Sequence, residues 1–249
     1  EAVKQRRFAP GVKVMGGTNL DEGTEFMVDL PPIRCNATQR DFKAWTNQTY
    51  GGKIGPKVAE FYSLLDNNSL IQPLPLCASY RQQPTSGKSW RTAAMRSATD
   101  YGLTCPLRRL ARNFLTAELH ANNATFFRYF FTHTPIYSAN FQDIRTQGAC
   151  HGCEVPFVFG DQFEIKDSGE ELLSKRMGCY WVNFAATGNP NSGGCPNNAT
   201  HALPYWPRYT YSGRGGGEEK LLELDVGENL RVLDGLKDER CDLFDQILT

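Results

Sequence analysis

The sequence predicts an α/β protein with a largely parallel β-sheet, because strand-like and helix-like segments alternate along the chain. Residues 12–16 form a short apolar run that ends in two glycines, and residues 124–132 are dense in aromatic side chains. Both patterns are typical of buried strands. Residues 89–119 and 170–186 have the apolar spacing of helices. The alternation therefore favours a sheet flanked by helices.

The two long helical segments contain signals for where helices begin and end. Residues 89–119 are expected to be helical with breaks at Gly102 and at Pro106, because proline suits the first turn of a new helix. Residues 170–186 are followed by Gly188-Asn-Pro190, a combination that is typical of a helix end.

Shorter elements complete the expected order. Residues 31–90 are rich in Pro, Asn and Gly and predict a loop-rich excursion with short helices, such as residues 56–65. Residues 219–224 alternate weakly, as in an edge strand, and residues 229–248 are expected to form a C-terminal helix. Because no internal repeat or low-complexity linker divides the chain, we expect residues 1–249 to belong to one domain.

Composition and charge exclude several classes of partner. The 249 residues include 27 basic and 27 acidic side chains, so no excess of one sign favours nucleic acid or an anionic membrane surface. The apolar runs are shorter than the roughly 18 to 20 residues that cross a bilayer. We therefore expect a soluble protein with no membrane span. The chain starts at Glu1 without an apolar signal sequence, so we expect any targeting segment to have been removed.

Cysteines and glycosylation signals indicate the secretory pathway. The chain has 8 cysteines, an even number that favours disulfides in an oxidising compartment. Asn-x-Ser/Thr acceptor patterns exceed the roughly two matches expected by chance. They begin at Asn36, Asn47, Asn67, Asn123 and Asn198. Together these signals predict a secreted glycoprotein with mostly bridged cysteines.

Two segments carry residue types that suit catalysis. Residues 16–26 form a polar loop with acidic side chains directly after the first expected strand. The carboxyl ends of parallel strands are where α/β folds build their sites. Residues 148–160 place His151 between small residues and ahead of an apolar run, which can hold an imidazole near the surface. Each segment is also compatible with an ordinary loop, so neither defines a site by itself.

Cys150, His151 and Cys153 leave several chemical interpretations open. They could ligate zinc, although no second Cys-x-x-Cys or histidine pair lies at zinc-finger spacing. A c-type haem box needs histidine directly after the second cysteine, where Glu154 stands. A redox dithiol is conceivable, but in a secreted chain we expect the two cysteines to form separate structural bridges. We expect neither a metal nor a cofactor.

Four segments, in order over nearly the whole chain, form a specific pattern. Residues 17–26 read Gly-Thr-Asn-Leu-Asp-Glu-Gly-Thr-Glu-Phe, and residues 151–160 read His-Gly-Cys-Glu-Val-Pro-Phe-Val-Phe-Gly. Residues 100–106 read Asp-Tyr-Gly-Leu-Thr-Cys-Pro, and residues 181–191 precede Trp206-Pro207. The pattern resembles the C-terminal half of the type-B carboxylesterases, the α/β-hydrolases that include cholinesterases and fungal lipases.

The resemblance implies roles for individual residues. Glu22 matches the acid and His151 the base of a Ser-Glu-His triad, in the chain order of this fold. Cys105 and Cys241 match the family's C-terminal disulfide. The other six cysteines depart from the shared pattern, and we predict Cys35 with Cys77 as one pair.

The nucleophile that the resemblance requires is missing from the sequence. No Gly-x-Ser-x-Gly elbow occurs in the chain, and the glycine-rich oxyanion segment is also absent. The resemblance therefore implies a secreted serine ester hydrolase whose nucleophile lies on an N-terminal chain of the same precursor. A fragment of a longer chain is the main competing interpretation of this gap. A non-catalytic adhesion or structural relative is the alternative function.

Overall fold

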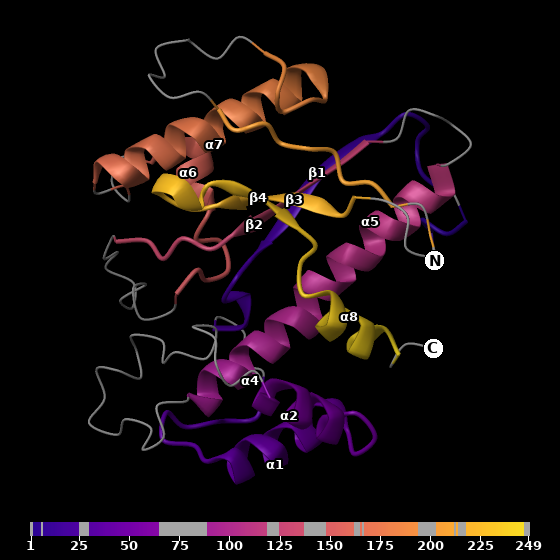
Figure 1. The fold of residues 1–249 in the computed structure, drawn as a ribbon, viewed down its shortest axis with the longest axis vertical. Coiled ribbons are helices and arrows are strands. Elements are labelled where there is room, and N and C mark those ends of the chain that lie inside the picture. The colour runs from indigo at the N-terminus through magenta and orange to yellow at the C-terminus, as the bar shows by residue number, and fades with distance from the viewer. Residues whose placement is uncertain are drawn as a thin grey trace. The chain divides into compact units, whose positions relative to one another are not determined.

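The fold is described from a computed structural model (Figure 1). The structure describes residues 2–5, 7–24, 30–64, 89–118, 125–136, 148–161, 165, 167–193, 203–211, 213 and 218–246. Contacts divide the chain into two compact units. The sheet unit comprises Glu1–Thr18, Pro106–His133 and Glu154–Lys237, and the helical unit comprises Asn19–Cys105, Thr134–Cys153 and Asp238–Thr249.

The sheet contains the strands β1 (Lys13–Asn19), β2 (Thr125–Phe131), β3 (Lys220–Leu224) and β4 (Arg231–Asp234), in that spatial order. β2 and β3 run parallel, with Tyr129 opposite Leu222. β4 is antiparallel to β3, with Leu233 opposite Leu221. Together with the flanking helices, this mixed sheet confirms the predicted α/β class.

Helices cover both faces of the sheet. Successive side chains of β2 point to opposite faces and therefore pack against different helices. Phe126 packs against Phe114 of α5 (Cys105–Glu118), with ring centroids 6.1 Å apart. The next residue, Phe127, packs against Phe184 of α7 (Ser168–Thr187), at 6.0 Å. Figure 1 shows α5 and α7 on opposite sides of the sheet. The short helix α6 (Val155–Phe159) packs against α7.

Local signals fix both ends of α7, and the sequence predicts the C-terminal one. The Asp167 side chain accepts a hydrogen bond from the Glu170 amide at the N-terminus. Gly188 ends the helix with a φ of 72°, a left-handed conformation that glycine adopts without a steric penalty.

Two predictions near the C-terminus are wrong. Residues 219–224 do not form an edge strand, because β3 lies between β2 and β4. Residues 229–248 are not one helix. A 3-10 turn (Gly227–Asn229), the strand β4 and the helix α8 (Asp238–Asp245) replace it. The reason lies in the backbone, because Gly235 and Lys237 have φ values of 77° and 55° that interrupt a right-handed helix.

The expected break at Gly102 takes the form of a change of helix type, not a loss of helical structure. Between α4 (Trp90–Thr99) and α5, the backbone forms a π-helical turn, Asp100–Thr104. The Cys105 amide donates to the Asp100 carbonyl, so backbone hydrogen bonding continues through the glycine. Pro106 lies in the first turn of α5, as predicted.

The helical unit has its own apolar core. It contains α1 (Gln39–Tyr50), α2 (Gly55–Leu64), α4 and α8. The core side chains are fully or nearly fully buried and include Phe42, Trp45, Val58, Tyr62, Trp90 and Phe244. A disulfide joins Cys105 to Cys241 within this core. Because it closes a loop of 136 residues, it stabilises the folded state by about 5 kcal/mol in the chain-entropy picture.

A buried histidine ties together three elements of the sheet unit. His133, just after β2, contacts Asp225 through Nδ1 and Glu170 through Nε2, each at 2.9 Å. Burial lowers the pKa of His133, but its hydrogen bonds to the two carboxylates outweigh burial and raise the pKa above the ordinary value of 6.5. The imidazolium therefore links the end of β2 to β3 and α7.

We predict that the sheet unit loses stability as the pH rises above neutral. A raised pKa in the folded state means that the contribution of His133 is complete below about pH 6.5 and is lost as the pH rises through the folded pKa. Urea unfolding across this range measures the loss. The variant His133→Gln should lack this component of the pH dependence, and an unchanged pH dependence in the variant would contradict the assignment.

Candidate active site

The acidic residue of the site follows directly after β1. Glu22 is three residues beyond Asn19, the last residue of that strand. The Asn19 amide donates to Oε1 of Glu22 at 2.7 Å, and the Glu22 side chain is only 7% exposed. One carboxylate oxygen is thus anchored by backbone, which leaves the direction of the other well defined.

The histidine lies on a tight turn closed by a disulfide. The Cys153 amide donates to the Cys150 carbonyl at 3.2 Å, so residues 150–153 form one turn. Gly152, the third residue of the turn, has a φ of 75°, which suits glycine. A disulfide joins Cys150 to Cys153. His151 is the second residue of this turn, and its side chain is 52% exposed.

The structure brings Glu22 and His151, which are 129 positions apart, into direct contact. Nδ1 of His151 lies 2.5 Å from Oε2 of Glu22. Because an ionised carboxylate can only accept, this contact favours the tautomer with its proton on Nδ1. The Nε2 lone pair of that tautomer can accept a proton from a hydroxyl group. The pair therefore has the arrangement of a general base with its orienting acid.

A network of buried hydrogen bonds joins the loops that carry the two residues. The Asp21 amide donates to the Ala149 carbonyl at 2.9 Å, and the Ala149 amide donates back to Oδ2 of Asp21 at 3.2 Å. Nδ2 of Asn19 donates to the Cys150 carbonyl at 2.7 Å. Arg96 of α4 donates to Oδ1 of Asp21 at 2.8 Å, in a pair that is nearly fully buried.

Sequence reasoning did not assign a role to Asn19, Asp21 or Arg96. Asn19 and Asp21 lie within the 17–26 segment that was singled out for Glu22, so their signal was present there. Arg96 lies in a helical segment 75 positions from Asp21, and no local sequence pattern links the two.

Gly23 allows the Glu22 loop to pack closely on α4. Its amide donates to Oγ1 of Thr99 at 2.9 Å. A Cβ atom at this position would lie 2.4 Å from the Met95 carbonyl oxygen, which is a rigid backbone atom. Glycine is therefore required after Glu22, because the loop lies too close to the backbone of α4 for a side chain.

We predict that Gly23→Ala lowers both stability and any activity that depends on Glu22. The added methyl group has to push the loop away from Met95, which displaces the neighbouring carboxylate from His151. The destabilisation should be about 1 to 3 kcal/mol, as for other overpacked positions. Thermal unfolding and ester hydrolysis measure the two effects. As a control, Gly52→Ala meets no atom within 4 Å and should change neither.

The pairing of Cys150 with Cys153 differs from the prediction and bears on the possible zinc site. The prediction of separate bridges for Cys150 and Cys153 is wrong, because their turn brings the two Cα atoms within 5.3 Å and the sulfurs bond to each other. This bond removes both thiolates from any zinc site. Among the residues that the structure describes, no group of three His, Cys, Asp or Glu side chains could hold a metal.

Cys35 and Cys179 are also disulfide-bonded. Cys77 and Cys195 lie outside the described residues, so the predicted Cys35–Cys77 pair stays a prediction.

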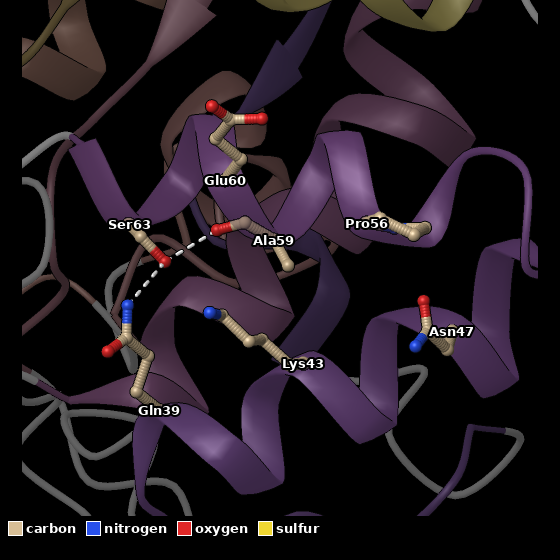
Figure 2. Close-up of a pocket in the computed structure, with 7 residues that line it drawn as sticks. All are labelled: Gln39, Lys43, Asn47, Pro56, Ala59, Glu60 and Ser63. Atoms are coloured by element: carbon tan, nitrogen blue, oxygen red, sulfur yellow. Dashed lines mark hydrogen bonds between the residues drawn. The ribbon is translucent and has the colours of Figure 1, made fainter.

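A groove of about 460 Å³ lies between α1 and α2, and neither Glu22 nor His151 lines it (Figure 2). Figure 2 shows Gln39 of α1 donating to Ser63 of α2 across it. It is lined by Gln39, Lys43, Asn47, Pro56, Ala59, Glu60 and Ser63. None of the lining residues is a histidine that could act with a carboxylate as His151 does with Glu22, so the candidate site is assigned to the Glu22–His151 pair.

Comparison with known proteins identifies the family. A model of the carboxylesterase family matches residues 1–244, nearly the whole chain. The chain belongs to the carboxylesterase family. Carboxylesterase 4A of Bos taurus is 38% identical over 128 residues, which are 51% of this chain and 20% of the relative. Cholinesterase of Mus musculus is 28% identical over 242 residues, which are 93% of this chain and 34% of the relative.

A further relative is also covered only in part. Acetylcholinesterase 1 of Caenorhabditis briggsae is 28% identical over 221 residues, 84% of this chain and 32% of the relative. This carboxylesterase-family chain thus spans between 20% and 34% of the length of these curated relatives. Within the described residues, no helix is long and apolar enough to cross a bilayer.

Proposed function

We propose that this chain supplies the acid and the base of a secreted serine hydrolase that cleaves carboxylic esters. The observation that carries the proposal is the contact between Nδ1 of His151 and Oε2 of Glu22, at 2.5 Å on a half-exposed imidazole. Membership of the carboxylesterase family supports esters as the substrate class.

In the proposed reaction, the pair activates a serine hydroxyl. His151 accepts the hydroxyl proton at Nε2 as the serine oxygen attacks the ester carbonyl, and Glu22 stabilises the resulting imidazolium. The imidazolium then donates the proton to the leaving alcohol, which gives an acyl-enzyme. A water molecule, activated by the same histidine, hydrolyses the acyl-enzyme and restores the free serine.

The proposed nucleophile and oxyanion hole lie on an N-terminal partner of the same precursor. The 249 residues contain no Gly-x-Ser-x-Gly elbow, while Glu22 and His151 are both in place. The partial coverage of the relatives supports a missing N-terminal portion. One α/β-hydrolase domain would then include residues 1–249 together with that portion.

The secreted location rests on the cysteines and the acceptor asparagines. Among the described residues, Asn36 and Asn47 are exposed, as glycan attachment requires, and every described cysteine is disulfide-bonded. Asn67, Asn123 and Asn198 lie outside the described residues. Treatment with a glycosidase that removes N-linked glycans should reduce the mass of the natural protein and convert the occupied asparagines to aspartate.

A serine-directed fluorophosphonate probe tests the proposed function. The complete protein that contains this chain should react with the probe, and peptide mapping should place the label on a serine outside residues 1–249. The protein should also hydrolyse a soluble p-nitrophenyl ester. A complete protein that neither reacts nor hydrolyses any ester would favour the non-catalytic adhesion or structural alternative.

A further inference from the structure

The disulfide between Cys150 and Cys153 encloses the proposed base in a ring of four residues. Both cysteines are almost completely buried, at 3% and 2% exposure, whereas the His151 side chain between them is half exposed. The two cysteines thus anchor the turn in the protein interior, and the imidazole projects from it.

Several restraints hold the turn that carries the half-exposed His151 side chain. The His151 side chain is 52% exposed, and its backbone and its hydrogen bond to Glu22 both help to place it. The Cys150 carbonyl is fixed by two donors, the Cys153 amide and Nδ2 of Asn19. The disulfide adds a covalent restraint to the same turn.

We propose that the Cys150–Cys153 disulfide is a positioning element for His151, which holds the imidazole in contact with Glu22 without touching substrate. The proposal deepens the proposed function and rests on it. A disulfide that spans three positions removes less conformational freedom from the unfolded chain than one that spans 136, so it contributes less to global stability than Cys105–Cys241 does. Its main effect is on the turn itself, where it restricts the backbone on both sides of His151.

Catalysis is sensitive to such a restraint. A displacement of about 1 Å in a reacting group can reduce the rate by about a hundredfold. Without the disulfide, the turn loses its covalent closure, and the imidazole samples positions away from Glu22. The expected loss therefore falls on kcat, while KM stays nearly constant because the cysteines do not contact substrate.

The test compares two disulfides of the helical unit in the complete protein. The double variant Cys150→Ala/Cys153→Ala should lower kcat for a p-nitrophenyl ester by about ten- to a hundredfold, with KM little changed and only a small drop in the thermal midpoint. The matched control Cys105→Ala/Cys241→Ala should do the reverse, with a much lower thermal midpoint and an unchanged kcat well below that midpoint. If the alanine pair fails to fold, Cys150→Ser/Cys153→Ser replaces it.

A spectroscopic measurement separates this proposal from the proposed function. The Nδ1 proton of His151 should give a low-field proton NMR signal that Glu22→Gln and Cys150→Ala/Cys153→Ala both weaken. Absence of hydrolysis by the wild-type protein would overturn the proposed function, while the NMR signal would still report on positioning. An unchanged kcat together with an unchanged signal in the cysteine double variant would overturn the positioning role.

Discussion

Replacing Glu22 with glutamine is expected to lower kcat/KM for ester hydrolysis by about three to four orders of magnitude. The Asn19 amide donates to Oε1 of Glu22 and would keep the glutamine oxygen at that position. The glutamine NH₂ group then faces Nδ1 of His151 and donates to it. The imidazole has to carry its proton on Nε2, where it cannot accept one from a serine.

The size match between the two side chains makes Glu22→Gln a sharp test. The fold should be retained, which circular dichroism and thermal unfolding check, while steady-state hydrolysis reports kcat/KM. Glu171→Gln makes the same chemical change on an exposed side chain of α7 and should leave the activity unchanged. A loss of less than about tenfold for Glu22→Gln would contradict the role of Glu22 as the orienting acid.

Among single substitutions, Asp100→Asn is expected to cause a large loss of stability. Asp100 is fully buried, accepts from the Tyr62 hydroxyl at 2.5 Å and lies 3.4 Å from Nη1 of Arg240. Burial, together with the Asp100 charge, raises the pKa of Tyr62 well above 10, so its hydroxyl remains a donor. Asparagine removes the countercharge of Arg240, whose side chain is only 9% exposed. We expect a loss of roughly 3 to 5 kcal/mol in the free energy of unfolding.

Urea unfolding of the Asp100 variant checks this value. Asp234→Asn, at an exposed position of β4, is the control and should change the stability by less than about 0.5 kcal/mol. The double variant Asp100→Asn/Arg240→Met should recover part of the loss, because it no longer buries an unpaired charge. A single Asp100→Asn variant as stable as the control would show that the cluster contributes little.

The sequence predicts those elements whose signals are local. The stop signal at Gly188 directly follows the apolar helical spacing of residues 170–186, and the structure has α7 there, ending at Thr187. The edge position of residues 219–224 was wrong because strand order depends on pairing with distant segments. The single helix over residues 229–248 was wrong because β4 forms only by pairing with β3.

In the candidate site, too, contacts between distant segments could not be predicted from local sequence signals. Glu22 and His151 were named through the family resemblance, since no spacing rule joins residues 129 positions apart. The bond between Cys150 and Cys153 could not be chosen from the sequence, because eight cysteines permit about a hundred pairings. The contact between Asp21 and Arg96 likewise required the fold that packs α4 on the Glu22 loop.

The most direct test of the central claim, that this chain supplies the base of a serine esterase, is the rate of fluorophosphonate labelling in His151→Ala. The wild-type complete protein should be labelled on a serine outside residues 1–249. The alanine variant, with an unchanged thermal midpoint, should be labelled at least about a thousandfold more slowly, because no group accepts the serine proton. Labelling of the variant at the wild-type rate would contradict the assignment of His151 as the base.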